Sequence, residues 1–208
     1  DVSNQAFPFL SFRAMDLGAV PALVGRISFT GDLGYEIWVT PDYQLALYEL
    51  LRQAGAEHDM RLFGSRALHS LRLEKSFGSW TREYTPDYSV FECGLDRFVD
   101  LRKNDFIGRD AVLKQREEGA KRRLVTFKID VDDFDAIGDE PVFHDGEVVG
   151  WVSSGGYAHA SKASVALGYV KTELAEATDF EIEILGVMHT AHRVDDPLFD
   201  PKGAQMRG

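Results

Sequence analysis

Cysteine is almost absent from this chain, whose 208 residues include a single one, Cys93. No disulfide can form within the chain, and nothing in the sequence indicates secretion. We therefore expect the protein in the cytoplasm of a bacterium or in the mitochondrial matrix. Because no paired histidine signature accompanies Cys93, a buried small residue is a better interpretation of it than a nucleophile.

Long apolar runs and an excess of positive charge are also missing. No run approaches the roughly 18 apolar residues that a membrane span needs, so we expect no membrane contact. The 23 Lys and Arg residues are outnumbered by 34 Asp and Glu, which gives a net charge of −11 and argues against a nucleic-acid partner. The hydrophobic fraction of 44% is nevertheless sufficient for a folded core.

Several motifs that carry chemistry are absent as well. The chain has no Gly-x-Gly-x-x-Gly after a predicted strand, no Walker motif and no Gly-x-Ser-x-Gly elbow, so no dinucleotide site is expected within it. The six histidines are scattered along the chain. His189 and His192 are three apart in a predicted strand and should point to opposite faces, so we expect no metal site.

The patterns that are present predict an α+β first part. Strands are expected at 20–29 and 35–39 with a turn at Gly31–Gly34. Thr40-Pro41-Asp42 predicts the start of a helix that continues to residue 54. Ser65 is expected to cap a second helix that reaches about Phe77, followed by a long loop over 78–94 and a third helix over 110–118.

The second part has the pattern of an all-β fold. Its short strand candidates, which are separated by turns such as Asp145-Gly146, are 123–129, 148–152, 164–170, 180–184 and 189–194. Regularly spaced short strands are typical of a sandwich or barrel. We therefore predict a domain boundary near residues 119–121, with domains 1–119 and 120–208.

Glu36 is the most informative polar residue of the first part. It follows Tyr35 and opens an apolar strand, so alternation places Tyr35 and Ile37 on one face and Glu36 on the other. The pattern alone leaves two interpretations, a solvated strand residue or a fixed acceptor in a pocket. A carboxylate in a pocket could accept two adjacent N–H donors from a nitrogen-rich ring.

Nine segments in a common order resemble the folate-binding C-terminal region of dimethylglycine and sarcosine dehydrogenases, which belongs to the glycine cleavage T-protein (aminomethyltransferase) superfamily. They are Ala6–Phe9, Thr30–Glu36, Ser70–Lys75, Glu92–Leu95, Asp105–Ala111, Lys121–Leu124, Val148–Gly150, Ser153–Tyr157 and Ala166–Val170. The resemblance covers nearly the whole chain. It implies the latter part of the aminomethyltransferase folate-binding domain followed by a C-terminal antiparallel β-barrel.

The resemblance also implies a ligand and an activity. The ligand would be tetrahydrofolate, and the activity would be capture of a one-carbon unit from a small methylated amine or an aminomethyl donor. Glu36 matches the family's pterin-binding glutamate, and Tyr35 precedes it. Trp80 falls where relatives carry a tyrosine, although a tryptophan in a loop also commonly seals a core edge.

Two further residues are candidates for the folate site. Arg72 could pair with Glu36 or with a folate carboxylate, or form a structural salt bridge. Tyr157 could lean toward the pocket from the barrel, or pack within its own turn. The family's catalytic aspartate precedes the Ala6–Phe9 motif, so no catalytic residue is expected in this chain.

We expect part of the natural protein, including the FAD domain of a dehydrogenase, to precede Asp1, and the isolated segment to be inactive. Three alternatives stay open: a free-standing aminomethyltransferase, a non-catalytic folate-binding or assembly module of the same fold, and a structural barrel without a ligand. The sequence also leaves a homo-oligomer open.

Overall fold

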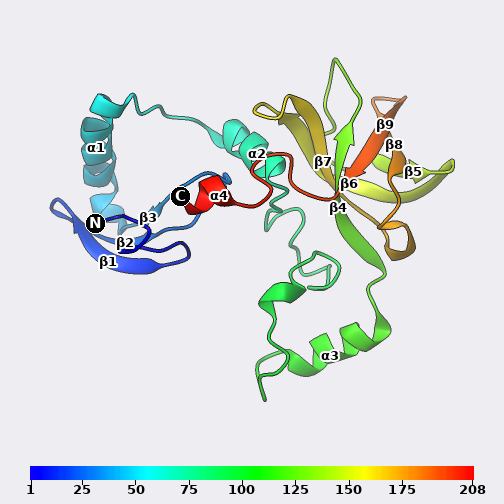
Figure 1. Ribbon diagram of the computed structural model, residues 1–208, viewed down its shortest axis with the longest axis horizontal. Helices are drawn as coiled ribbons and strands as arrows, with labels where there is room; N and C mark the ends of the chain where they lie inside the picture. The colour runs from blue at the N-terminus through cyan, green and yellow to red at the C-terminus, as the bar shows by residue number, and fades with distance from the viewer. The chain divides into compact units, whose positions relative to one another are not determined.

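The computed structural model describes residues 1–208 without a gap, and the chain divides into two compact units (Figure 1). The first comprises Asp1–His69 and Asp200–Gly208, and the second comprises Ser70–Phe199. Helix α2 (Ser65–Glu74) contributes residues to both. The predicted domains, 1–119 and 120–208, divide the chain at a change of sequence pattern, and that division stays a prediction.

A three-stranded antiparallel sheet organises the first unit. Its strands are β1 (Phe12–Leu17), β2 (Val20–Gly25) and β3 (Glu36–Trp38), in the order β1-β2-β3. One face packs on Phe7, which is fully buried, through alternate residues of the strands such as Val24. Strand β1 was not predicted, because its polar and apolar residues do not form a strongly hydrophobic run.

Strand β2 ends four residues before the predicted position 29. Beyond Gly25 the chain turns, because the Ser28 hydroxyl accepts a hydrogen bond from the Gly31 N–H at 3.0 Å. Gly31 has a φ of +88°, a conformation that glycine adopts without a steric penalty. The turn predicted at Gly31–Gly34 therefore begins earlier, at Ser28.

The helices of the first unit begin and end close to the predicted positions. A single 3-10 turn, η1 (Pro41–Tyr43), precedes α1 (Gln44–Gly55), and a second, η2 (Ala56–His58), follows it. Thr40 stands at the cap of η1, but its side chain makes no capping hydrogen bond. A short helix, α4 (Ala204–Arg207), closes the C-terminal segment of this unit.

Helix α2 is shorter than predicted. Ser65 is its first residue, and it ends at Glu74, three residues before Phe77. Ser76 has a φ of +56°, in the left-handed region, so the helix cannot continue through it. The Phe77 N–H instead donates back to the Arg72 carbonyl at 2.9 Å.

A closed antiparallel barrel forms most of the second unit (Figure 1). Its strand order is β4-β7-β6-β5-β8-β9, and the strands are β4 (Arg122–Ile129), β5 (Pro141–His144), β6 (Glu147–Ala158), β7 (Ala163–Lys171), β8 (Asp179–Ile184) and β9 (Val187–Val194). Phe127, Val142 and Ile182 are buried in its interior. The predicted α+β fold with a C-terminal antiparallel barrel is confirmed.

The remaining elements of this unit connect α2 to the barrel and the strands to each other. They are η3 (Asp96–Phe98), α3 (Arg109–Glu118) and η4 (Thr172–Leu174). Helix α3 ends where predicted, at Gly119, whose φ is +77°. Strand β5 was missed because it has four residues and begins with proline, a residue that cannot donate to a sheet ladder.

Candidate functional site

The open face of the β1-β2-β3 sheet carries Glu36. Gly25 lies opposite both Phe12 and Glu36 in the sheet register, and Leu23 lies opposite Trp38. Directly opposed residues of an antiparallel pair present their side chains on the same face, and so do residues two apart along one strand. Phe12, Leu23, Glu36 and Trp38 therefore share one face of the sheet.

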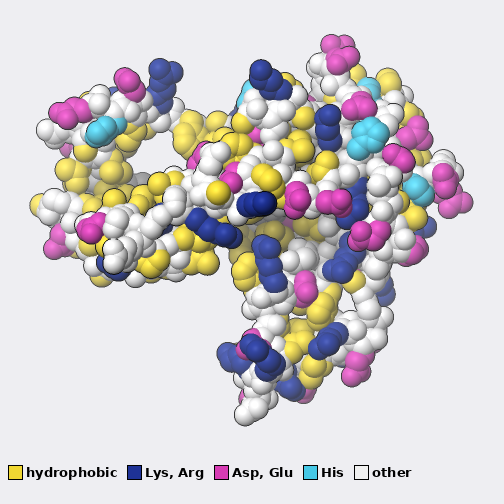
Figure 2. All heavy atoms as spheres, viewed as in Figure 1, with side chains coloured by type: hydrophobic (Ala, Val, Ile, Leu, Met, Phe, Trp, Pro, Cys, Tyr) yellow, Lys and Arg dark blue, Asp and Glu magenta, His cyan; other side chains and the backbone are white.

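Gly25 makes room for two aromatic rings on this face. A Cβ atom at Gly25 would lie 2.6 Å from Cε1 of Phe12 and 2.9 Å from Cζ3 of Trp38. The rings stack across it, with centroids 5.3 Å apart and planes inclined by 28°. Phe12 is 51% exposed and Trp38 41% exposed, so the pair forms an open aromatic surface. Figure 2 shows hydrophobic side chains, in yellow, on the surface of the molecule. The surface formed by the pair is suited to stack against a planar ring.

Glu36 supplies the charge on the same face. Its side chain is exposed and has no hydrogen-bond or ion-pair partner in the structure. The predicted alternation is present, because Ile37 packs with the core on the opposite face. Tyr35 also turns away from Glu36: its ring centroid lies 5.9 Å from that of Phe7, and its hydroxyl donates to the Val2 carbonyl at 3.4 Å.

Arg72 has a buried partner that the sequence analysis did not identify. Its Nη1 atom lies 3.1 Å from Oε2 of Glu83, and both side chains are almost completely excluded from solvent. Of the three roles considered for Arg72, this geometry favours the structural salt bridge. The guanidinium is not accessible to a ligand in this arrangement, so the expected contact with Glu36 or with folate has no support.

Glu83 is the centre of this network. Besides Arg72 it accepts hydrogen bonds from the Ser79 N–H at 2.8 Å and from the hydroxyls of Ser153 and Ser154 at 2.6 and 2.5 Å. Burial by itself favours the protonated form, but the two serines, the Ser79 amide and the Arg72 charge outweigh it and lower the pKa of Glu83. Burial lowers the pKa of Arg72, against the opposing charge of Glu83. The network joins the segment after α2 to strand β6.

Trp80 and Tyr157 both lie in the second unit, and both are exposed. The Trp80 ring is 78% exposed and meets Tyr84 edge to face, with centroids 5.8 Å apart. Tyr157 is 42% exposed and meets His159 in the same manner at 5.0 Å. It lines a cavity of about 510 Å³ together with Lys128 and Lys162. The five predicted folate contacts are therefore divided, two in the first unit and three in the second.

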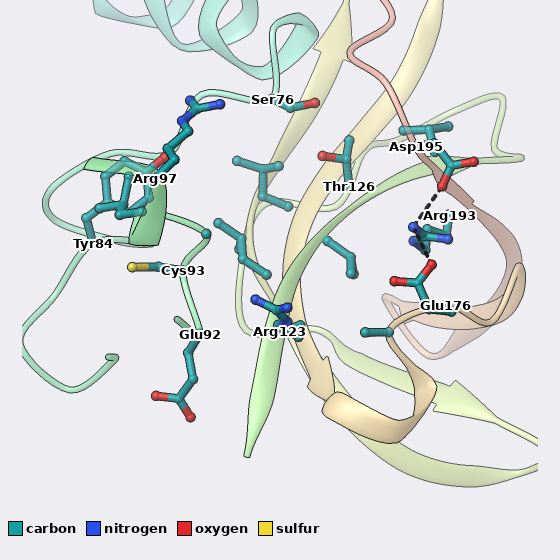
Figure 3. A pocket seen from close by; sticks show the side chains of 17 residues that line it. Ser76, Tyr84, Glu92, Cys93, Arg97, Arg123, Thr126, Glu176, Arg193 and Asp195 are labelled. Atoms are coloured by element: carbon teal, nitrogen blue, oxygen red, sulfur yellow. Dashed lines mark ion pairs between the residues drawn. The ribbon is translucent and has the colours of Figure 1, made fainter. Parts of the chain in front are cut away.

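A second cavity, of about 330 Å³, was not foreseen from the sequence (Figure 3). It is lined by Cys93 and by residues of β4 and β9. Cys93 is buried, its Sγ donates to the Ser89 carbonyl at 3.2 Å, and burial raises the pKa of its thiol. The expected interpretation of Cys93 as a small buried residue is confirmed.

No three histidine, cysteine, aspartate or glutamate side chains gather in a way that could hold a metal ion. His192 instead lies 3.3 Å from Asp130 and 3.5 Å from Asp179. None of the helices combines the length and the apolar character that crossing a bilayer requires.

Comparison with known families identifies both parts of the chain. Residues 1–103 match the GCVT N-terminal domain, and residues 122–200 match the glycine cleavage T-protein C-terminal barrel domain. Dimethylglycine dehydrogenase of Mus musculus is 38% identical over 100% of this chain but only 24% of its own length. The mouse pyruvate dehydrogenase phosphatase regulatory subunit is 31% identical over 86% of this chain and 23% of its own length.

A solved structure has the same fold. The crystal structure of the glycine cleavage system aminomethyltransferase T from Bartonella henselae superposes with a TM-score of 0.83 at 24% identity. The match covers 96% of this chain and 55% of that protein. The chain thus spans about a quarter of the dehydrogenase and about half of the aminomethyltransferase.

Proposed function

Because the chain belongs to the glycine cleavage T-protein superfamily, we propose that it is the folate-binding part of a tetrahydrofolate-dependent one-carbon transfer enzyme. The dimethylglycine dehydrogenase relative favours a flavin-linked demethylating dehydrogenase as the longer protein. In such a protein the FAD would be held by another segment. The one-carbon donor would be a small methylated amine, or an aminomethyl group as in the aminomethyltransferases, and the protein would function in a bacterial cytoplasm or a mitochondrial matrix.

The open face of the β1-β2-β3 sheet is the observation that carries this proposal. Glu36 is a carboxylate without a partner, beside a stacked and exposed Phe12–Trp38 pair. A pterin offers a planar ring for stacking and adjacent N–H donors for one carboxylate. The residues on the face therefore fit the nitrogen-rich edge and the flat surface of that ring. Glu36 would orient the ring and would not act as a base.

The other predicted folate contacts keep different roles in this proposal. Trp80 and Tyr157 stay proposed as aromatic contacts. Tyr35, also a predicted contact, is proposed only as support for strand β3, because its ring packs against Phe7 and turns away from Glu36. Arg72 is proposed only as a support for the loop that carries Trp80, because its partner Glu83 also binds the Ser79 N–H next to that ring. We assign no catalytic residue to this chain.

Tetrahydrofolate, when bound, supplies the nucleophilic nitrogen that captures the one-carbon unit. The contribution of the chain is to hold the ring in place. Holding two reactants side by side removes much of the entropic cost of their encounter. Two quantities should therefore be measured separately, the affinity for tetrahydrofolate and the transfer of the one-carbon unit to it.

The decisive experiment compares Glu36→Gln with the unmodified sequence in the full-length protein. Calorimetric titration with tetrahydrofolate should show binding weakened by about tenfold or more, because a charge-assisted bond is lost. Glu49→Gln on helix α1 is the matched control, since Glu49 is also exposed, and it should bind as the unmodified protein does. Equal affinity in Glu36→Gln and the control would refute the assignment.

A non-catalytic module is the second candidate, and the regulatory-subunit relative is the observation that favours it. The same full-length protein separates the two when it is supplied with dimethylglycine, sarcosine, tetrahydrofolate and an electron acceptor, which takes up the two electrons that leave the methylated amine through the flavin. Formation of methylene-tetrahydrofolate supports the enzyme. Folate binding without turnover of any methylated amine supports the module, and absence of both supports a structural barrel.

A further inference from the structure

The cavity of about 510 Å³ lies at one end of the barrel, and every residue that lines it belongs to the Ser70–Phe199 unit. Its lining comes from the end of β4 and the residues that follow, from the end of β6 and from the start of β7. Ligand sites commonly occur in the mouths of β-barrels and occupy about 300–1,000 Å³. The place and the volume of this cavity therefore suit a small organic molecule.

Ser164 is a buried polar residue of this lining, and its hydroxyl has no partner. The residue is 4% exposed, and its Oγ atom is one of three buried side-chain atoms in the protein that make no hydrogen bond. Ser164 lies opposite Ile129 of β4, which is part of the barrel core, so its side chain is on the interior face. Buried polar groups are nearly always hydrogen-bonded. A polar group of a ligand would supply the partner that the Ser164 hydroxyl lacks.

A second atom of this kind lies at the same end of the barrel. Nε2 of His189 is buried and makes no hydrogen bond. His189 lies opposite Ile182, another residue of the barrel core, so it also faces the interior. The Asp130 N–H donates to the Thr190 carbonyl at 2.9 Å, which brings His189 level with Val131 of the cavity lining. Two of the three unpartnered buried atoms are thus at the end of the barrel where the cavity lies.

Tyr157 supplies a flat wall of the cavity. It lies opposite Ser164 in the register of β6 and β7, so the two side chains are on the same face of the sheet. Its ring is 42% exposed and contacts His159 edge to face. The face of an aromatic ring is partly negative and attracts the C–H groups of a saturated ring. Tyr157 can therefore support a saturated ring whose edge reaches Ser164.

The charged groups of the lining are balanced. Lys128 and Lys162 are matched in number by Asp130 and Asp132, and all four are exposed. The lining therefore selects neither an anion nor a cation by its net charge. Lysine donates hydrogen bonds, a carboxylate accepts them, and a hydroxyl group does both. A neutral ligand with several hydroxyl groups matches all of these side chains.

We propose that this cavity binds a neutral sugar. One face of the sugar ring packs on Tyr157, one hydroxyl pairs with Ser164, and the hydroxyls at the outer edge contact the lysines and aspartates of the lining. This site is separate from the sheet face that carries Glu36, which belongs to the other unit.

Ligand-observed NMR titration of the full-length protein tests this proposal. We expect saturable binding, with a Kd below about 20 mM, of at least one of D-glucose, D-galactose, D-mannose and D-ribose. Tetrahydropyran, which has the ring but no hydroxyl groups, should bind more weakly by about tenfold or more. The phosphate ester of the bound sugar should bind no more tightly than the sugar, because the lining has no excess of positive charge. Adenosine distinguishes the source: tighter binding than D-ribose indicates a sugar carried on a nucleoside, weaker binding indicates a free sugar, and both support the site.

Two variants test the residues that carry the proposal. Tyr157→Leu should weaken sugar binding by about 3- to 10-fold, and Ser164→Ala by roughly 2- to 10-fold. Because the Ser164 hydroxyl has no partner within the protein, Ser164→Ala should keep the melting temperature, so that weaker binding reports a lost ligand contact. Tyr48→Leu is the matched control, because Tyr48 is 47% exposed on helix α1 outside the cavity, and it should bind sugar unchanged.

Tetrahydrofolate is included as a competitor, because Tyr157 is also proposed as a folate contact. Sugar binding that persists with saturating tetrahydrofolate and in Glu36→Gln supports a separate site. Displacement of the sugar by tetrahydrofolate would assign Tyr157 to the folate site and would overturn the separate site. If tetrahydrofolate does not bind at all, the proposed function fails while sugar binding still supports this cavity.

Four other results would also overturn the proposal. They are no saturable binding of any of the four sugars, equal affinity for tetrahydropyran, a phosphate ester bound about tenfold more tightly than its sugar, and unchanged binding in both Tyr157→Leu and Ser164→Ala. Melting temperatures report whether each variant is folded. If Tyr157→Leu does not fold, Ser164→Ala and the comparison of ligands still decide the matter.

Discussion

Glu83→Gln should be among the most destabilising conservative substitutions in the Ser70–Phe199 unit. The change keeps the size of the side chain and removes its charge. Arg72 would then lose the carboxylate that lies 3.1 Å from its Nη1 atom, in a site where both side chains are excluded from solvent. Removing one partner of a buried ion pair typically costs about 3–5 kcal/mol.

The structure sets the expected magnitude near the lower end of that range. A glutamine can still accept hydrogen bonds from some of the groups that now bind Glu83, which are the Ser79 amide and the Ser153 and Ser154 hydroxyls. We therefore expect a loss of about 3 kcal/mol in the free energy of unfolding. That loss is a large fraction of the roughly 5–15 kcal/mol that stabilises a typical domain.

Urea unfolding followed by circular dichroism measures this loss, and a second variant isolates its cause. Arg72→Met combined with Glu83→Gln removes both charges, so it should recover more than half of the stability lost in Glu83→Gln alone. Asp100→Asn serves as the control, because the Asp100–Arg102 pair is exposed and its loss should have no measurable effect. A Glu83→Gln protein as stable as this control, or a double variant no more stable than Glu83→Gln, would refute the reasoning.

Three further predictions concern the pH dependence of stability, the reactivity of the cysteine and a close contact of a barrel glycine. The pKa of Glu83 in the folded protein lies below its ordinary value of 4.5, so as the pH falls the unfolded chain is protonated at this carboxylate before the folded protein is. The free energy of unfolding should therefore fall as the pH drops below about 4.5. Glu83→Gln should flatten this dependence when unfolding is measured over a series of acidic pH values. Burial raises the pKa of the Cys93 thiol, so iodoacetamide should modify it at pH 8 only after urea is added, as mass spectrometry can show. Gly150→Ala should lower the free energy of unfolding by about 1–3 kcal/mol, because its Cβ would lie 2.0 Å from the Tyr169 carbonyl oxygen. Gly64→Ala is the steric control, because Gly64 has open space around it and no positive φ.

Much of the fold could be predicted from local patterns. In the barrel, strands β4 and β8 alternate polar and apolar residues, and strands β6 and β7 contain long apolar runs. Helix α3 has glycines at both ends. Strands β1 and β5 were missed because their pairing, rather than their own composition, makes them strands. The end of α2 was placed too late because a left-handed Ser76 carries no sequence signal as strong as glycine.

The candidate sites were predictable only in part. Alternation along a strand was enough to separate Glu36 from Tyr35 and Ile37, because that geometry is local. The Phe12–Trp38 pair beside Glu36 was not predicted, because it depends on a sheet register that brings together residues 26 positions apart. Glu83 was likewise not recognised as the partner of Arg72, although only 11 residues separate them, since a loop conformation decides which charges meet.

The sequence alone determined that this is an acidic α+β protein with a single cysteine and a C-terminal barrel. It also determined the membership in the glycine cleavage T-protein superfamily. Composition, periodicity and the order of motifs are properties of the linear chain, so no tertiary structure was needed for these conclusions. Tertiary structure alone decided that Arg72 is buried against Glu83 and that Tyr157 and Ser164 line one cavity. The physical reason is that burial and electrostatic pairing depend on distances between segments, which closure of the barrel and packing of the loop over residues 78–97 establish.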